Sequence, residues 1–386
     1  MKIALITGTF FPFPGGVQVE VHNFSNKFSN KGNEVHVFVN KDVCLKNNKY
    51  KIYKLKYINL SILYFIKFYL RLNLKFFFNF FNFNLIDLDY EIYHFHFLNF
   101  KSLILIEFLK FHKKKVIVTF HGADIQIEKA INYGFRLNKK YDLYLKKIIK
   151  KVDCFQCISK NIYIDLKKLG INEKKIFQIS NSIKFNKFRL FPRRKNLSKT
   201  IKFITVGRYA KYKKGFDLVP LLGKKLINKK INFRWKIIGE NSNKLNDEKF
   251  IRENKNLFIT IPNIKNNSET YHPGKRLISQ YYSANLYINL ARVESFGLTF
   301  IEALASGLPI LSFNTKGINE ILVNNKNGFF LKNLDNFVDK VLVLQKDPKK
   351  YLKLVKSSYN SVKKYDLDKN VLKIENMYKK FVNLKN

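Results

Sequence analysis

The sequence predicts an α/β protein made of two doubly wound, Rossmann-like domains that face each other across a cleft. Short segments that are apolar throughout alternate with longer segments of helical spacing along the whole chain. This alternation is typical of parallel sheets whose two faces are covered by helices. The series of strands is interrupted once, near the middle of the 386 residues, and the chain is long enough for two domains of ordinary size.

The predicted strands form two series separated by one irregular segment. The first series covers residues 3–7, 35–39, 92–96, 116–120, 154–158 and 176–179, and the second covers 203–206, 235–238, 257–261, 286–289 and 310–313. Residues 184–200 are basic, lack a period and contain Pro192, so we interpret them as a linker. The predicted domains therefore span 1–183 and 201–365, and a C-terminal helix at 366–386 returns toward the N-terminal domain.

The charge of the chain is strongly positive, with 72 Lys and Arg against 28 Asp and Glu and a formal net charge of +44. A basic protein attracts phosphate, whether on nucleic acid, on an anionic bilayer or on a phosphorylated substrate. Lys, Asn, Ile, Phe and Tyr are all used heavily, as AT-rich codons would dictate, and we assign part of the excess charge to this drift in composition.

The low, odd number of cysteines favours a reducing, cytoplasmic location. Cys154 and Cys157 form a Cys-x-x-Cys, but the segment has the pattern of a buried strand and no matching pair of ligands lies nearby, so we expect neither zinc nor redox chemistry. The apolar start runs into Gly15 and Gly16 without a cleavage site and fits a first strand and its loop. No segment has the roughly 18 uncharged apolar residues of a spanning helix.

The segment 292–310, RVESFGLTFIEALASGLPI, has the features of an anion-binding site. It follows a predicted strand, Gly297 permits a tight turn, and a helix begins near Thr299 with free backbone N–H groups at its start. Glu294 lies before the turn and Glu302 lies inside the helix, so that both carboxylates flank the place where a diphosphate fits. Carboxylates accept hydrogen bonds from sugar hydroxyls, and a nucleotide sugar carries a sugar on each side of its diphosphate. A plain strand–turn–helix with a dipole-stabilised glutamate is the structural alternative.

Three segments together resemble glycosyltransferase family 4, the retaining group 1 glycosyltransferases with the GT-B fold. ESFGLTFIEALASGLPI resembles the family's E-x7-E region, GRYAKYKKGFD its Gly-Arg and Lys-Gly elements, and KGINEILVNNKNGFFL its Gly-x-x-Glu and Asn-Gly elements. The resemblance implies a nucleotide-diphosphate sugar as co-substrate, held by residues 201–365, and a hexose transferred to a glycan or lipid-linked acceptor held by residues 1–183. It implies synthesis of a cell-surface polysaccharide, lipopolysaccharide or glycolipid.

The resemblance also implies roles for individual residues. Arg208 and Lys214 would neutralise the diphosphate, and an insertion of one residue makes Lys213 an alternative to Lys214. Glu302 would bind the ribose and Glu294 would hold the transferred sugar as a catalytic residue. The donor phosphates and sugar would also meet backbone groups of four consecutive residues: Phe296, Gly297, Leu298 and Thr299.

The N-terminal half contains a second set of candidate residues at the ends of strands. Gly16 follows the first strand, as in the family's glycine-rich loop, where backbone approaches the donor phosphate. His121 lies in His-Gly-x-Asp at the end of another strand, and the resemblance assigns it a catalytic contact with the transferred sugar. We expect His94 and His96 to point in opposite directions, so that at most one of them faces the ligand. Asp124 stays open as a base for an inverting mechanism.

The family pattern implies retention of configuration without a metal ion, because Arg208 and Lys214 supply the positive charge that a divalent ion would bring. Two other functions stay open. A sugar-nucleotide epimerase would also combine Rossmann-like domains with a diphosphate site, and a non-catalytic membrane- or nucleic-acid-binding protein could retain the fold. Intact Glu294 and Glu302 favour the transferase.

Residues 43–86 contain no Asp or Glu, eight Lys or Arg, and many aromatic and aliphatic residues. The segment fits an amphipathic surface on an anionic membrane, a nucleic-acid surface, or ordinary core with drifted surface lysines. The lysine-rich helix at 139–152 adds to the positive charge. We favour peripheral contact with the inner face of the plasma membrane and expect no nucleic-acid partner.

Overall fold

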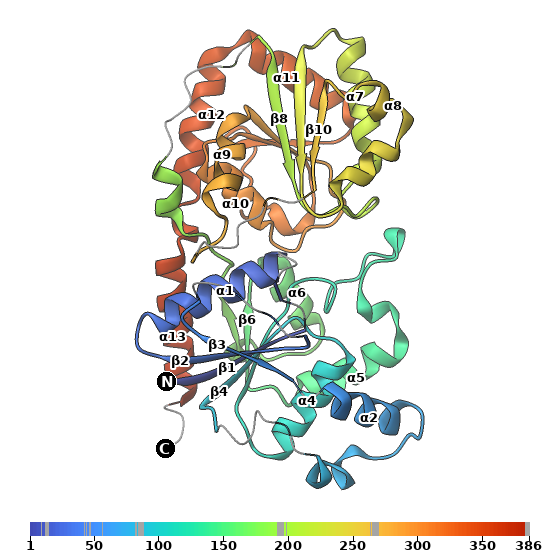
Figure 1. Ribbon diagram of the computed structural model, residues 1–386, viewed down its shortest axis with the longest axis vertical. Helices are drawn as coiled ribbons and strands as arrows, with labels where there is room; N and C mark the ends of the chain where they lie inside the picture. Colours follow the sequence, from blue (N-terminus) through green and yellow to red (C-terminus); the bar gives the residue numbers. More distant parts are fainter. Residues whose placement is uncertain are drawn as a thin grey trace. The chain divides into compact units, whose positions relative to one another are not determined.

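The computed structural model describes the chain except residues 9, 12–14, 42, 44, 46–47, 56, 82, 84–88, 191–196, 198, 263, 265–269 and 383–386. The chain divides into two compact units, which are described one at a time (Figure 1). The N-terminal unit comprises Met1–Asn181 and Asp368–Asn386, and the C-terminal unit comprises Ser182–Leu367. These boundaries lie close to residues 183 and 366, where the sequence predicts the limits of the domains.

The N-terminal unit contains a seven-stranded parallel sheet in the order β3-β2-β1-β4-β5-β6-β7. Its strands are β1 Lys2–Thr7, β2 Glu34–Val39, β3 Lys51–Lys54, β4 Ile92–His96, β5 Val116–Thr119, β6 Cys154–Cys157 and β7 Ile176–Gln178. Its helices include α1 Gly16–Ser29, α2 Tyr57–Phe68, α4 Phe100–Phe111, α5 Lys139–Ile149 and α6 Lys160–Lys168. The order of the strands reverses between β1 and β4, so loops that follow these two strands diverge and leave space between them.

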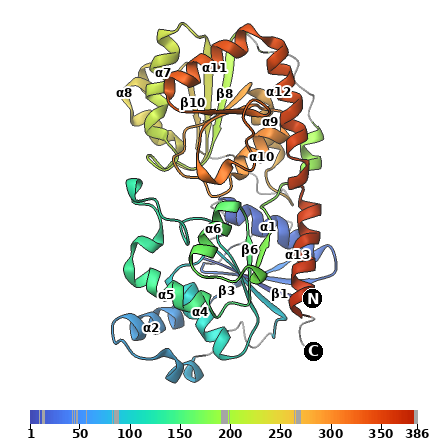
Figure 2. The same cartoon turned by 180° about the vertical axis from the view of Figure 1, so that it is seen from behind.

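The C-terminal unit contains a six-stranded parallel sheet in the order β10-β9-β8-β11-β12-β13. Its strands are β8 Ile201–Val206, β9 Phe233–Ile238, β10 Phe258–Ile261, β11 Leu286–Asn289, β12 Ile310–Phe313 and β13 Gly328–Leu331. Its α-helices include α7 Val219–Asn228, α8 Lys249–Glu253, α9 Lys275–Ser283, α10 Leu298–Ala305, α11 Leu334–Lys346 and α12 Pro348–Ser361, which flank the sheet (Figure 2). Here the order of the strands reverses between β8 and β11.

These two sheets confirm the predicted fold class, and all the predicted strands are present within a few residues of their expected ends. Two further strands, β3 and β13, were not predicted. β3 is an edge strand with a lysine at each end and partly exposed side chains between them, so it lacks the buried apolar pattern of its neighbours. β13 is short and begins with Gly328, whose lack of a Cβ lets the strand lie against the carbonyl of Ile310.

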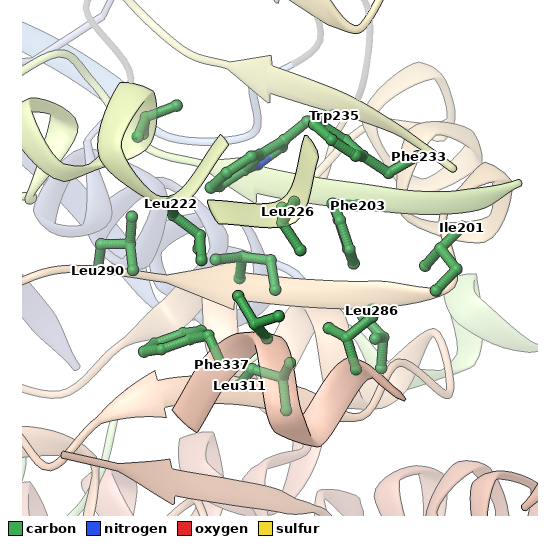
Figure 3. Close-up of a cluster of buried hydrophobic side chains, with 14 of the residues drawn as sticks. Ile201, Phe203, Leu222, Leu226, Phe233, Trp235, Leu286, Leu290, Leu311 and Phe337 are labelled. Atoms are coloured by element: carbon green, nitrogen blue, oxygen red, sulfur yellow. The ribbon is translucent and has the colours of Figure 1, made fainter. Parts of the chain in front are cut away.

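The core of the C-terminal unit fills the space between its sheet and the helices on one face (Figure 3). Trp235 is fully buried at its centre, and its indole N–H donates to Thr205 Oγ1 at 3.0 Å. Thr205 in turn donates to the carbonyl of Ile288 at 2.7 Å, which ties β8 to β11. A satisfied polar link inside an apolar core fixes the register of the two strands whose ends carry the candidate site.

The C-terminal helix α13, Leu367–Val382, packs on the N-terminal unit, to which residues Asp368–Asn386 belong. Tyr378 is fully buried against Phe24 and Phe28 of α1, and its hydroxyl lies 2.6 Å from His94 Nδ1. Asn370 donates to the carbonyl of Ser180 at 2.9 Å. Because these contacts are buried and long-range, the last helix belongs to the core of the first domain.

The segment predicted as a linker, residues 184–200, is not irregular throughout, because part of it packs into the C-terminal unit. Its first residues form a short 3-10 helix, Phe185–Leu190, in which the aromatic rings of Phe185 and Phe188 are buried in the C-terminal unit. Asn186 and Lys187 separate the two phenylalanines, and Arg189 follows them, so the sequence shows no apolar run here. Most of the remaining segment, including Pro192, lies outside the described residues. Across the part of the chain with described positions, no helix is long and apolar enough to cross a bilayer.

Candidate active site

The candidate donor site lies where the strand order of the C-terminal unit reverses. The loop after β8 contains Arg208 and Lys214, and the loop after β11 contains Glu294, followed by α10 with Glu302. β8 and β11 are neighbouring parallel strands, so both loops leave from the same edge of the sheet. In open α/β sheets this reversal point is where ligands bind. The fold thus gathers residues that lie up to 94 positions apart in the chain.

Glu302 is buried in the second turn of α10, with 5% of its surface exposed. The hydroxyl of Tyr281, from α9, donates to Glu302 Oε2 at 2.7 Å and fixes the orientation of the carboxylate. Burial raises the pKa of Glu302 to about 7, and the hydrogen bond from Tyr281 offsets part of this rise. A carboxyl group with this pKa is partly protonated near neutral pH. A ligand that donates hydrogen bonds to the carboxylate would stabilise its charged form and lower the pKa again.

Glu294 is also buried, and its Oε1 forms an ion pair with the ammonium group of Lys214. This contact shows that Lys214 reaches the glutamate despite the inserted residue. Gly215, with φ of +68°, lies so close to the end of β11 that a Cβ would stand 1.9 Å from the carbonyl oxygen of Leu290. The glycine therefore lets the Lys214 loop approach the Glu294 loop.

Arg208 is exposed at the end of β8, and none of the described residues is bonded to its guanidinium group. It differs in this respect from Lys214, whose charge is balanced by Glu294. An exposed guanidinium without a carboxylate partner is suited to bind a phosphate by two parallel hydrogen bonds.

The start of α10 has the geometry of an anion-binding helix end. Gly297 is the N-cap and has φ of +92°, so a side chain here would strain the backbone and crowd Phe300. The side chain of Phe296 is buried against Tyr365, with ring centroids 5.6 Å apart, and Leu298 is buried as well. These residues can therefore offer a ligand only their backbone. Thr299 Oγ1 lies 2.8 Å from the hydroxyl of Tyr287 on β11, which fixes the first turn.

Two supporting residues were missed from the sequence. Arg292 forms two parallel hydrogen bonds with Asp217, at 2.8 and 2.7 Å, and donates to the carbonyl of Tyr212, so it clamps the Lys214 loop to the Glu294 loop. A Cβ on Gly317 would stand 2.1 Å from the carbonyl oxygen of Glu294. Both residues lie within quoted motifs, but their partners are distant in sequence, so spacing alone could not reveal these contacts.

In the N-terminal unit His121 follows β5, and its loop is held by Asp124. The carboxylate of Asp124 is fully buried and accepts hydrogen bonds from the backbone N–H groups of Leu98, His121 and Gly122, at 2.8 to 3.2 Å. Burial raises the pKa of Asp124 to about 7, and these hydrogen bonds act in the opposite direction. Because both carboxylate oxygens accept hydrogen bonds from backbone N–H groups, Asp124 anchors the backbone around His121.

The expectation that His94 and His96 point in opposite directions is wrong. Residues two apart on a strand share one face of the sheet, and the two rings lie 4.2 Å apart. His96 Nδ1 lies 3.2 Å from His121 Nε2, while His96 Nε2 is buried without a partner among the described groups. An unpaired acceptor costs less than an unpaired N–H donor, so we infer that His96 Nδ1–H donates to His121.

The hydrogen bond from His96 determines which ring nitrogen of His121 carries the hydrogen. If His121 Nε2 accepts from His96, its Nδ1 bears the hydrogen and can donate to a ligand. Burial lowers the pKa of His121 to about 3, so the ring stays neutral at physiological pH. A neutral N–H donor is suited to a sugar hydroxyl and does not add charge to the site.

Gly16 is the first residue of α1 and is exposed. The side chain of Gln18 turns back to accept from the backbone N–H of Gly15 at 3.0 Å, and a Cβ on Gly15 would displace this side chain. A small pocket of about 10 Å³, enough for roughly one water molecule, lies at the carboxyl ends of β1 and β4. Its lining combines polar residues, among them Asn40 and Asn99, with apolar ones such as Leu55 and Leu60. It lies at the reversal of the strand order, as the donor site does in the other unit.

The remaining metal-type motifs belong to other segments of the chain. Cys154 and Cys157 are buried in β6 and form no disulfide within the described part of the chain, and Cys44 lies outside the described residues. Asp-Leu-Asp occurs at 87–89 and 366–368. Asp89 and Asp368 form ion pairs with Lys114 and Lys27, and neither belongs to the donor loops.

Two family models match the chain and together span nearly all of it. Residues 187–361 match Glycosyl transferases group 1, and residues 14–187 match Glycosyltransferase Family 4. The chain belongs to the group 1, family 4 glycosyltransferases. This membership confirms the resemblance seen in the three sequence segments, and the matched regions contain the loops of both units described above.

Relatives of this glycosyltransferase include proteins of known and unknown substrate. An uncharacterized glycosyltransferase of Methanocaldococcus jannaschii is 25% identical over 358 residues, which cover 86% of each chain. An uncharacterized glycosyltransferase of Haemophilus influenzae is 29% identical over 176 residues, 45% of this chain and 46% of the relative, so that match spans about half of the relative's length. The alpha-monoglucosyldiacylglycerol synthase of Acholeplasma laidlawii is 28% identical over 177 residues, 45% of this chain and 42% of that enzyme.

Solved structures share the fold over the whole length. Anabaena HepE in complex with UDP-glucose has a TM-score of 0.69 at 12% identity, with full coverage of both chains. Sucrose-phosphate synthase from Thermosynechococcus elongatus has a TM-score of 0.75 at 13% identity, also with full coverage. The glycosyltransferase therefore has the GT-B fold of two Rossmann-like domains.

The anchoring role of Asp124 leads to a prediction about stability. The substitution Asp124→Asn leaves at most one good acceptor for three backbone N–H groups, so we expect the free energy of unfolding to fall by about 2–3 kcal/mol. Urea denaturation of the purified variant measures this loss. If turnover disappeared while the unfolding curve stayed unchanged, Asp124 would be a catalytic base instead of an anchor.

Proposed function

We propose that this glycosyltransferase moves a hexose from a nucleotide-diphosphate donor to a glycan or lipid-linked acceptor, with retention of configuration. One observation carries the proposal: the reversal of strand order between β8 and β11 gathers two cations, two buried carboxylates and a glycine-capped helix start. These groups match a ligand with two phosphates between two polyols. Neither a nucleic acid nor a simple phosphate would need both buried carboxylates.

The donor would be held from its nucleotide toward its sugar. Glu302 would accept hydrogen bonds from the two ribose hydroxyls, with its orientation set by Tyr281. The diphosphate would meet Arg208, Lys214 and the backbone of Gly16 and of Phe296 to Thr299. Glu294 would hold the hydroxyls of the transferred sugar, and His121 would donate to that sugar from the other unit. UDP-glucose in the structurally similar HepE supports a donor of this class.

The transfer would proceed without a protein base. The bond between the anomeric carbon and the leaving phosphate oxygen breaks, the acceptor oxygen bonds to the same face, and the acceptor proton moves to the leaving phosphate. Arg208 and Lys214 would stabilise the charge that develops on the diphosphate, and the proposed reaction needs no metal ion. The engagement of Asp124 by three backbone N–H groups supports retention, because it removes the candidate base for inversion.

The acceptor belongs to cell-surface polysaccharide or glycolipid synthesis in this proposal, and the enzyme works at the inner face of the plasma membrane. A glycolipid synthase among its relatives supports a lipid-linked acceptor.

The test is a turnover screen with UDP-, GDP- and ADP-sugars, followed by NMR of the product anomer. We expect release of one nucleoside diphosphate and a glycoside with the anomeric configuration of the donor. An inverted product would refute retention. Conversion of the sugar nucleotide into its epimer, without loss of the nucleotide, would replace the transferase by an epimerase.

A further inference from the structure

Large apolar side chains lie exposed along one stretch of the N-terminal unit. Among the described residues 21 large hydrophobic side chains are exposed, and eight of them lie within residues 58–80. We call this set the α2 surface: Ile58, Ile62, Phe65, Tyr69, Leu70, Leu72, Phe76 and Phe80. Phe76 and Phe80 expose 76% and 82% of their surface. Soluble proteins rarely leave so many large apolar groups together in water unless they bind something.

The opposite side of the same stretch is firmly packed, so the exposed residues do not result from a loose segment. Leu60 and Leu63 of α2 are buried against the domain, and Phe68 forms edge contacts with Phe100 of α4 and Tyr144 of α5. Phe78 lies against Phe108 and Phe111 in the same way. α2 lies outside α4 and α5 in both views (Figures 1 and 2). Residues 58–80 therefore have two apolar sides, one packed against the domain and one exposed to solvent.

The charged residues within the segment that carries the α2 surface are all basic. Residues 43–86 contain no acidic residue, and Arg71 and Lys75 are exposed between the apolar side chains. Burial lowers the pKa of Lys67, and the charges of Lys147 on α5 and of Lys151, which follows that helix, lower it further. The ammonium group of Lys67 lies 5.7 Å from the centre of the Tyr144 ring of α5. Glu107 acts in the opposite direction from beneath the helix, where it bonds to Tyr144 and Lys151.

We propose that the α2 surface binds an anionic bilayer, with its isoleucine, phenylalanine and tyrosine side chains at the boundary between headgroups and acyl chains. Arg71 and Lys75 would contact lipid phosphates beside them. Interfacial helices combine an apolar side with flanking basic residues in this way. The inference rests on the proposed membrane location of the enzyme, but it does not depend on the identity of the donor.

Charge and chemistry favour the bilayer over other occupants. A second copy of the chain, docked through the same surface, would bring two sets of like charges together. A single-stranded nucleic acid stacks on exposed aromatic faces, whereas Ile58, Ile62, Leu70 and Leu72 offer no ring. Aliphatic and aromatic groups mixed with Arg and Lys fit the chemistry of a phospholipid layer.

The test is flotation of the full chain with phosphatidylcholine vesicles, with and without phosphatidylglycerol. We expect strong binding to the anionic vesicles only. The variant Phe65→Ser/Phe76→Ser/Phe80→Ser should lower the partition coefficient by about tenfold or more, because it removes three rings that enter the interface. The variant Arg71→Gln/Lys75→Gln should lower it by about fivefold per residue.

The matched control is Leu221→Ser/Leu372→Ser, which removes two exposed apolar side chains elsewhere and should leave flotation unchanged. Wild-type protein that floats with neither vesicle, or a phenylalanine variant that binds like wild type, would overturn the proposal. So would a wild-type dimer in light scattering that the same variant dissociates. UDP-glucose affinity, measured in parallel, should be equal in all variants, so a failed donor assay with intact flotation refutes only the proposed reaction.

Discussion

Donor affinity is expected to weaken by about tenfold per pH unit as the pH falls below 7, the region where Glu302 takes up a proton. Burial raises the pKa of this carboxyl to about 7 in the free enzyme. The ribose hydroxyls donate to the charged carboxylate, so protonation competes with the donor below that pH, and affinity levels off above it. Isothermal titration with a UDP-sugar between pH 5.5 and 8.5 measures the effect; both limits are chosen to lie roughly 1.5 units from this pKa.

Glu302→Gln tests whether this residue is the cause. The amide keeps the shape but loses the charge, so we expect affinity at pH 8 to fall by about ten- to a hundredfold and the dependence on pH to disappear. Tyr281→Phe, which removes only the hydroxyl that holds Glu302 Oε2, should produce a smaller loss. If the slope persisted in Glu302→Gln, another group would be responsible, and Asp124, whose pKa also lies near 7, would be the first to test.

Replacement of Glu294 is expected to lower kcat by about a hundred- to a thousandfold with little change in KM. Its carboxylate would hold the transferred sugar as the anomeric bond breaks, so its contribution is largest in the transition state. Glu294→Gln also leaves the ammonium group of Lys214 without its partner at the diphosphate. Steady-state kinetics across donor concentrations separates the two parameters.

The matched control for this substitution is Asp335→Asn, which breaks an ion pair with Lys225 on the exposed surface of the same unit. Exposed pairs contribute little, so its kinetics should match those of the wild type. The double variant Glu294→Gln/Lys214→Gln should lose less than the product of the two single losses, because the residues contact each other. An unchanged kcat in Glu294→Gln would show that Glu294 does not hold the transferred sugar.

The fold was predictable because its strands are buried on both faces and therefore appear as short apolar runs. β4, β11 and β12 have the predicted limits for this reason. β3 was not predicted because it is an edge strand whose exposed lysines interrupt the apolar run that marks the other strands. The exposed apolar side of α2 could not be separated from core by sequence, since the helix is apolar on both sides and only its packing distinguishes them.

The candidate site was predictable where it depends on local order, and it was missed where it depends on contacts between distant segments. A glycine after a strand and a carboxylate at a helix start are local signals, and they led to Gly297, Glu294 and Glu302. The clamp between Arg292 and Asp217 joins residues 75 positions apart. The support of Glu302 by Tyr281 likewise comes from another helix, and no spacing rule connects the two.

The central claim is that the reversal point between β8 and β11 holds a nucleotide diphosphate. A crystal structure of the enzyme soaked with UDP tests it most directly. We expect diphosphate density at the backbone of Gly297 to Thr299, with Arg208 and Lys214 in contact with the phosphates and the ribose on Glu302. Diphosphate density at any other place in the C-terminal unit, with Glu302 free of the ribose, would show that this reversal point is not the donor site.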